Sequence, residues 1–316
     1  MTALNDKLTR KISPMNNTYK WLLCLLVAAV TGISQAQTTD LARIEYTYFP
    51  QSDSDNSFRR FRSFLNFPIK LNENGAYLIP GIEYRNTNLK YNDPAVFDTN
   101  DLDRFQSFAT SLGYTFKMNE LWRFGAEAGL MAASNFETGE MISDDLIYTG
   151  AVYFIKITED ERYIEDVRLI LGLSYSTTSG IPFPLPVVNY YKRFDPKWSY
   201  GLGVPKTNLK YYINDKHNLQ AFVTLDGFFA NIQNNFAIAP SSSSSSLAVA
   251  ENISMTIVLA GLGYEYNFTD NLSLYLYAGH TLRNDIRLRD KNLDKVYTIN
   301  ETNSFYGRAG LKFSIL

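Results

Sequence analysis

The feature that most constrains this chain is a set of segments in which apolar and polar side chains alternate. In residues 123–132, Phe124 and Leu130 share one face, whereas Arg123 and Glu127 share the other. Successive side chains of a β-strand point to opposite faces, so a period of two predicts strands. Comparable alternation recurs in residues 167–175, 253–268, 272–289 and 305–316. Alternating segments of this length, separated by turn residues, are typical of a transmembrane β-barrel.

The connections between these segments alternate in length. Short turns fall at residues 72–75, 117–120, 195–197, 214–217 and 269–271, and longer polar stretches at 86–103, 134–145, 234–252 and 290–303. In outer-membrane barrels, short periplasmic turns oppose long extracellular loops. We therefore expect an all-β fold, an antiparallel transmembrane β-barrel of 12–14 strands, with the serine run Ser241–Ser246 outside. The strand count is open because the segments within residues 187–213 are short.

The first 36 residues have the pattern of a secretory signal peptide. Lys20 precedes a ten-residue apolar run at residues 21–30, and small residues at 34 and 36 precede Gln37. The apolar run is too short to anchor the chain across a bilayer. We expect cleavage before Gln37, which leaves residues 37–316 as one outer-membrane barrel domain.

Two further features of the composition limit the function. Cys24 is the only cysteine and lies in the leader, so the exported chain holds no thiol for a disulfide or a thiolate metal site. The formal net charge of −2 is not the basic footprint of a nucleic-acid-binding protein. Either Met1 or Met15 could start a complete leader. We expect the outer membrane of a Gram-negative bacterium, with its lipid and a small-molecule solute as partners and no nucleic acid.

Four short motifs lie close together in the middle of the chain. They are "PLP" at residues 184–186, "W...LGVP" at 198–205, "LKY" at 209–211 and "DGFFAN" at 226–231. Together they resemble an uncharacterised family of bacterial outer-membrane β-barrel proteins, the domain of unknown function 6268. The resemblance implies an outer-membrane barrel and brings no assigned activity.

Two of these motifs interrupt the strand pattern. Pro182, Pro184 and Pro186 stand within five residues, and proline cannot donate a hydrogen bond to a sheet. The cluster either ends a strand at the barrel rim or folds a rigid loop inward that narrows the pore. Asp226 beside Gly227 predicts a bulge or a tight bend, with a ligand contact at Asp226 as the alternative.

Charged residues that keep to one parity are predicted to face the lumen. A charge that faces hydrocarbon at mid-depth costs about 2–4 kcal/mol. Such residues either form a salt-bridged plug or line a channel and tune its solute preference. The predicted lumen-lining residues are Arg60, Arg62, Glu83, Arg85, Arg123, Glu127, Arg168, Asp226, Glu265 and Arg308.

Catalytic motifs are scarce. The two histidines, His217 and His280, lie in no recognisable acid–histidine or metal-ligand spacing, and no serine elbow stands out. We therefore expect no enzyme, no cofactor and no metal, with a surface hydrolase as the least favoured hypothesis. The favoured function is a passive channel or transporter for a small solute. The alternative is an occluded structural or interaction barrel that binds partners through its extracellular loops.

Overall fold

A computed structural model describes residues 39–95, 97–158, 167–238 and 248–315. The expected signal peptide, Cys24 and the serine run Ser241–Ser246 lie outside these residues. Strands make up 74% of the described residues, and three single turns of 3₁₀ helix lie between them. Among the described residues, no helix is long and apolar enough to cross a membrane. The 3₁₀ turns are η1 (Asn100–Leu102), η2 (Ser143–Asp145) and η3 (Thr177–Ser179).

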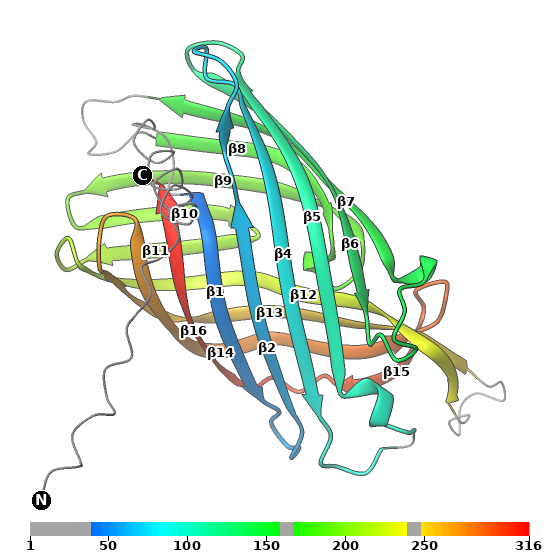
Figure 1. Ribbon diagram of the computed structural model, residues 1–316. Helices are drawn as coiled ribbons and strands as arrows, with labels where there is room; N and C mark the ends of the chain where they lie inside the picture. The colour runs from blue at the N-terminus through cyan, green and yellow to red at the C-terminus, as the bar shows by residue number, and fades with distance from the viewer. Residues whose placement is uncertain (1–38, 96, 159–166, 239–247, 316) are drawn as a thin grey trace, which may run out of the picture. The chain divides into compact units, whose positions relative to one another are not determined.

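Fourteen strands close into one barrel, which confirms the predicted fold class and strand number (Figure 1). Neighbouring strands pair antiparallel, and β1 pairs with the last strand to complete the ring. The short strands β3 (Ile69–Lys70) and β15 (Lys295–Asn300) extend β4 and β14 outside the ring. The ring is formed by β1 (Thr39–Pro50), β2 (Ser57–Asn66), β4 (Tyr77–Lys90), β5 (Arg104–Lys117), β6 (Trp122–Ser134), β7 (Leu146–Thr158), β8 (Val167–Ser176), β9 (Phe183–Asp195), β10 (Trp198–Val204), β11 (Lys206–Tyr212), β12 (His217–Ile238), β13 (Ala248–Asn267), β14 (Leu272–Arg289) and β16 (Phe305–Ile315).

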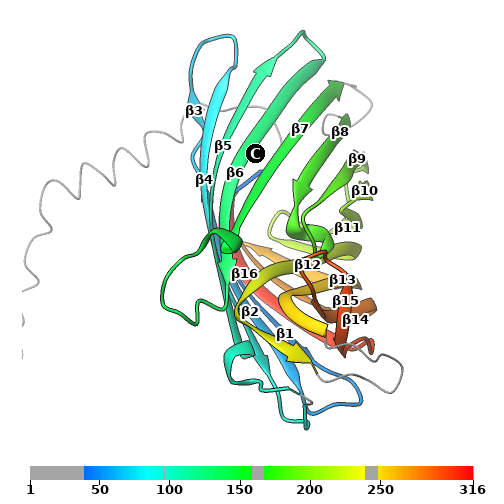
Figure 2. The same ribbon diagram turned by 90° about the vertical axis from the view of Figure 1, so that its right-hand side faces the viewer.

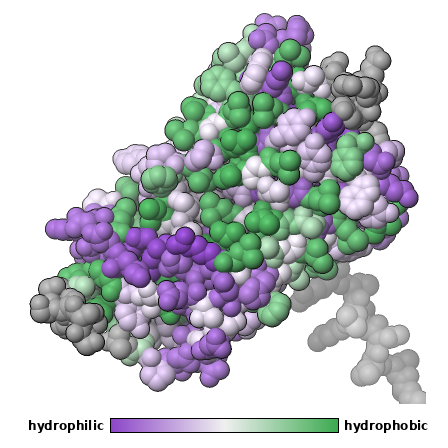
Figure 3. Space-filling model, turned by 180° about the vertical axis from the view of Figure 1, so that it is seen from behind, coloured by the Kyte–Doolittle hydropathy of each residue, from purple (hydrophilic) through white to green (hydrophobic). Residues whose placement is uncertain are grey.

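The alternation along the wall gives an apolar exterior and, on β1, polar residues on the interior face. On β1, Ile44 and Tyr46 are exposed, whereas Glu45 and Thr47 are buried. Figure 3 shows hydrophobic residues across the middle of one face and hydrophilic residues gathered toward one end. This exterior suits contact with lipid. Other exposed apolar residues of the wall are Ile82, Phe108, Leu112, Val152, Leu171, Leu173, Leu219, Val223, Leu262 and Leu276.

The two ends of the barrel differ in their connections. At one end, here called the terminal end, the Ser314 hydroxyl donates to Asp40 at 2.6 Å, and tight turns join β5 to β6, β11 to β12 and β13 to β14. At the other, the loop end, longer connections join β4 to β5, β6 to β7 and β14 to β16, and they contain η1, η2 and β15. The predicted short turns and long stretches thus fall at opposite ends.

The proline cluster lies at the loop end of β9. Pro184 and Pro186 lie inside this strand, opposite Tyr175 and Leu173 of β8, so the prediction that they end a strand is wrong. On its other side β9 pairs with β10 only from Val188 onward, which leaves the proline positions at a free edge. A free edge tolerates proline because no ladder hydrogen bond is lost there.

The strand β12 leaves the wall halfway along its length. Lys206–Tyr212 of β11 pairs with β12 only up to Thr224, because β10 and β11 have just seven residues each. Beyond this point β12 crosses to β6, where Asn231 pairs in parallel with Ser134 (Figure 2). Residues Gly227–Gln233, here called the crossing segment, are buried at every position. A strand buried on both faces no longer alternates, which explains the apolar run in "DGFFAN".

The turn η3 packs onto the crossing segment from the β8–β9 side. Thr256 of β13 donates to the Ser179 carbonyl at 2.7 Å, and Thr177 is buried. Gly180 has a φ of +84°, and a side chain there would meet the Met255 carbonyl at 2.4 Å. A side chain at Gly227 would lie 2.9 Å from the Thr178 carbonyl. The loop therefore folds inward, the second of the two predicted alternatives.

The predicted bulge at Asp226 is wrong. Pairing of β12 with β13 continues without interruption from His217 to Asn231, and the register shifts only between Asn231 and Phe236. The bend at Asp226 arises because β11 ends, while the β12–β13 ladder stays intact.

A hydrophobic core, here called the loop-end core, fills the barrel beneath the crossing segment. Phe49 and Phe58 pack edge to face with ring centroids 5.4 Å apart, and Phe58 and Phe105 both contact the Phe228 ring. Burial of apolar side chains is the main stabilising term in a folded chain. The largest fully buried side chains of this core are Phe49, Phe58, Phe105, Leu102, Ile232, Ile253, Met255, Ile257, Leu259, Ile286 and Leu288.

Candidate functional site

An ion-paired triad crosses the interior next to the loop-end core. Arg60 of β2 donates through both terminal nitrogens to the Asp226 carboxylate, at 3.0 and 2.6 Å. Arg308 of β16 donates to the same carboxylate at 2.6 Å and to the Thr47 hydroxyl at 3.0 Å. Since β12 neighbours neither β2 nor β16 in the ring, these side chains meet inside the barrel. The triad ties β12 to the opposite wall at the residue where β12 leaves β11.

A second cluster surrounds Glu265 of β13. Lys210 and Lys312 lie 2.9 and 3.0 Å from its carboxylate. Gln220 and Tyr277 also donate to it, at 2.8 and 2.9 Å. Two cations and two neutral donors satisfy a carboxylate that is almost completely buried.

A third cluster lies on β1, β2 and β4. Arg62 donates to Glu83 at 2.8 Å and lies 3.9 Å from Glu45, while Arg85 donates to the other oxygen of Glu83. Tyr275 of β14 donates to Glu45 at 2.6 Å. Together with the Glu265 cluster, these contacts join β11–β14, β16, β1, β2 and β4 across the interior.

The other side of the interior holds a cavity of about 180 Å³, here called the polar chamber. It lies against β4–β8, where small residues such as Gly81, Ala109 and Ala151 leave space inside the wall. The η3 turn borders it through Thr177 and Thr178. The charged and hydroxyl side chains that border it are Glu83, Arg85, Glu127, Ser111, Thr149, Ser174, Ser176, Thr177 and Thr178.

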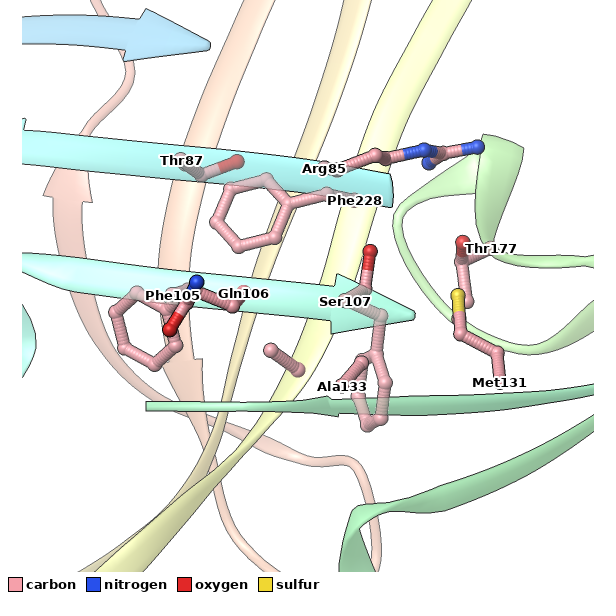
Figure 4. A pocket seen from close by; sticks show the side chains of 11 residues that line it. Arg85, Thr87, Phe105, Gln106, Ser107, Met131, Ala133, Thr177 and Phe228 are labelled. Carbon is pink, nitrogen blue, oxygen red and sulfur yellow. The ribbon is translucent and has the colours of Figure 1, made fainter. Parts of the chain in front are cut away.

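Two charged groups of the chamber have atoms without a hydrogen-bond or ion-pair partner among the described residues. Glu127 of β6 is exposed to the cavity, and its carboxylate has no hydrogen bond or ion pair with any described residue. Arg85 uses its Nε atom for Glu83, and its two terminal nitrogens have no partner among the residues described. Figure 4 shows a smaller pocket that shares Arg85, Met131 and Thr177 with the chamber, and there the Arg85 guanidinium extends away from Thr87 on the side of Thr177.

Two of the predicted lumen residues lie nearer the terminal end. Arg123 donates to the Gly75 carbonyl at 2.8 Å and lies over the Tyr77 ring. The Arg168 guanidinium lies 5.0 Å from the centre of the Tyr191 ring. Arg168 has the same strand parity as Ser174, which lines the chamber. The structure thus gathers Arg60, Asp226 and Arg308 in one group and Arg62, Glu83 and Arg85 in another, with Glu265 in a third and Glu127, Arg123 and Arg168 apart.

Some interior residues were missed by the sequence reasoning. Glu45 and its neighbour Arg43 share the inward parity of β1, so alternation in "RIEYTYF" was an available signal. Tyr275 and Tyr277 share the inward parity of β14 but are indistinguishable by type from lipid-facing tyrosines. Alternation gave no signal for the loop-end core. Its residues are apolar although they point inward, whereas the rule used for the prediction expects polar residues in the lumen.

Each of the two histidines lies within hydrogen-bond distance of a neighbouring group. His217 shares a hydrogen bond with the Tyr264 hydroxyl at 2.7 Å, and His280 lies 2.7 Å from the Thr281 carbonyl. Within the described part of the chain, no three His, Cys, Asp or Glu side chains are placed to hold a metal ion.

Comparison with known proteins gives a family and a set of distant barrels. The family model of the domain of unknown function DUF6268 matches residues 33–314. No curated protein sequence matches the chain. The COG4313 outer-membrane channel from Pseudomonas putida F1 is 10% identical with a TM-score of 0.41, over 90% of this chain and 98% of that one.

Two further solved structures are similar at the same level. The NanC porin is 10% identical with a TM-score of 0.38, over 87% of this chain and 100% of that one. LpxR from Salmonella typhimurium is 8% identical with a TM-score of 0.38 and the same coverages. These similarities concern the barrel fold alone.

Proposed function

The chain belongs to the DUF6268 family, a domain of unknown function, and we propose that it is an outer-membrane channel that passes a small solute. The observation that carries this proposal is the polar chamber of about 180 Å³ inside the barrel. Charged and hydroxyl side chains around an internal cavity are what a pore uses to select its solute. In this proposal the terminal end faces the periplasm, and the loop end faces outward.

The crossing segment is the gate in this proposal. It closes the loop half of the barrel. It belongs to the part of β12 that no longer pairs with β11. Asn231 has a single parallel pairing with Ser134 on the β6 side, in place of a continuous ladder. Displacement of this segment and of η3 away from β6 would connect the chamber to the loop end.

The second candidate is an occluded barrel that acts through its loops. The loop-end core favours it, since Phe49, Phe58 and Phe105 are at most 2% exposed and pack inside the loop half of the barrel. The two candidates differ in one physical respect. A channel requires the crossing segment to move, whereas an occluded barrel requires it to stay.

A reversible disulfide between β6 and β12 tests the channel. Residues 37–316 contain no cysteine, so the double variant S134C/N231C introduces the only two thiols, at positions that are paired in the structure. Conductance of purified protein is measured in planar bilayers before and after reduction. The matched control carries S134C alone, because a single thiol cannot cross-link within one chain.

We expect conductance in the wild type and the reduced double variant, and its loss on oxidation of the double variant alone. Conductance that persists in the cross-linked protein would show that the crossing segment is not the gate. Absence of conductance from wild type and reduced variant alike would favour the occluded barrel.

A further inference from the structure

The Glu127 carboxylate is the first of two observations about the ligand of the polar chamber. It is an ionisable group of inward parity that contacts open space, while the other interior carboxylates described above are ion-paired. A carboxylate accepts hydrogen bonds and pairs with cations. Glu127 therefore offers the chamber a site for a positively charged group.

The second observation is the free edge of Arg85. The Glu83 carboxylate accepts hydrogen bonds from Nε of Arg85 and from a terminal nitrogen of Arg62, so two cations already lie beside its negative charge. The two terminal nitrogens of Arg85 face the chamber as a planar pair of donors. A guanidinium edge of this kind binds a carboxylate or phosphate through two parallel hydrogen bonds.

The two groups are separated along the barrel. The Arg85 side chain donates to Glu83 of the same strand. Glu83 pairs with Ala109 of β5, and Ala109 pairs with Met131 of β6, so the three residues lie at one level of the wall. Met131 and Glu127 are four residues apart on β6, so the backbone positions level with the two groups are offset by about 13 Å along the strand, at about 3.3 Å per residue. Hydroxyl and small side chains line the space between them, including Ser111, Thr149 and Ser174.

From this arrangement we propose that the polar chamber binds an elongated zwitterion, a small solute with an ammonium group at one end and a carboxylate at the other. The ammonium group pairs with Glu127 and the carboxylate with Arg85. A solute with only one charge leaves the opposite protein charge unpaired in a confined space, which is costly. The inference rests on the proposed channel function and names the class of its solute.

Binding to the detergent-solubilised, full barrel tests the inference without any need for conductance. The probes are 6-aminohexanoate, hexylamine and hexanoate, which have the same chain length and are ionised at about pH 7. Dissociation constants are measured by isothermal titration calorimetry. We expect 6-aminohexanoate to bind at least tenfold more tightly than either singly charged probe.

The variants change one end of the proposed site. E127Q should weaken 6-aminohexanoate at least tenfold and leave hexanoate unchanged. E127K should reverse the preference, so that the dicarboxylate adipate binds more tightly than 6-aminohexanoate. The control E137Q removes an exposed carboxylate from the β6–β7 connection and should change nothing.

The inference is overturned if the wild type binds none of the probes, if hexylamine binds as tightly as 6-aminohexanoate, or if E127Q binds the zwitterion as the wild type does. These outcomes leave the channel proposal standing if conductance is observed. Conversely, zwitterion binding without conductance overturns the channel and keeps the site.

Discussion

The two halves of β12 obey different rules although they belong to one strand. From His217 to Thr224 the strand is part of the wall, and Leu219 and Val223 face outward while Gln220 and Phe222 are buried. In the crossing segment, Gly227–Gln233, every residue is buried. Asp226 stands at the junction and is held by Arg60 and Arg308. The wall half is stabilised by ladders to both β11 and β13, whereas the crossing half keeps only the ladder to β13 and is otherwise held by side-chain contacts inside the barrel.

This difference shows what strand alternation reports. Alternation marks a strand with lipid on one side and the barrel interior on the other. Where a strand enters the interior, both of its faces meet protein, and the pattern becomes continuous. Alternation along β12 therefore ends in "DGFFAN", where the strand leaves the wall.

The largest predicted effect comes from the junction. D226N removes the charge that Arg60 and Arg308 share, and it leaves two buried cations facing each other. Breaking a buried ion pair by removing one partner costs about 3–5 kcal/mol. Urea unfolding of the protein in lipid vesicles should show a loss of this size in the free energy of unfolding.

The control for D226N is a substitution in a solvent-exposed ion pair of the same protein. Glu73 pairs with Lys70 at 2.6 Å on the exposed β3–β4 turn. E73Q should leave unfolding unchanged, because solvent screens exposed pairs. If D226N behaves like E73Q, the crossing segment is held by apolar contacts alone.

The second prediction concerns the wall near this strand. Leu262 of β13 pairs with Ala221 in the wall half of β12, and 70% of its surface is exposed to the outside. L262R places a charge on the lipid-facing side and should cost about 2–4 kcal/mol if the residue lies near mid-depth. The same substitution measured in detergent should cost much less, since a micelle is thin and deformable. An equal cost in both media would argue against lipid contact at this position.

The third prediction compares small truncations in the two halves. Ile232 lies in the crossing segment and is 1% exposed, so I232V leaves a cavity and should cost about 0.5–1.5 kcal/mol. V223A removes methyl groups from the wall half, where lipid can fill the space. Its effect on unfolding in vesicles should be smaller than that of I232V. The reverse order would mean that the crossing segment is loosely packed.

Much of the barrel could be predicted from alternation, and the predictions that were wrong have one physical cause. The wall strands, the turns and the charged residues of inward parity follow from a local period of two. The crossing segment and the docking of η3 do not, because they depend on where β10 and β11 end in space. Pro184 and Pro186 illustrate this, since their place inside β9 is permitted only by the late start of the β9–β10 ladder at Val188.

The candidate site was predictable in its residue types but not in its pairings. Parity selects Glu83, Glu127 and Asp226 equally, as carboxylates of inward orientation. Which of them is paired depends on contacts across the barrel, over as many as 166 positions between Arg60 and Asp226. The unpaired state of Glu127 therefore emerges only from the structure.

The smallest predicted effect on stability is also the most specific, because it separates two glutamates of one chamber. Glu127 has no partner among the described residues and faces open space, so E127Q should change the free energy of unfolding by less than about 0.5 kcal/mol. Glu83 holds Arg62 and Arg85, and E83Q should destabilise the barrel clearly, because both guanidinium groups lose their shared carboxylate. The two variants have identical chemistry, and urea unfolding in vesicles compares them directly. Equal losses would mean that Glu127 makes a stabilising contact and that the chamber is filled; a loss for E83Q alone identifies Glu127 as a charge free to meet a solute.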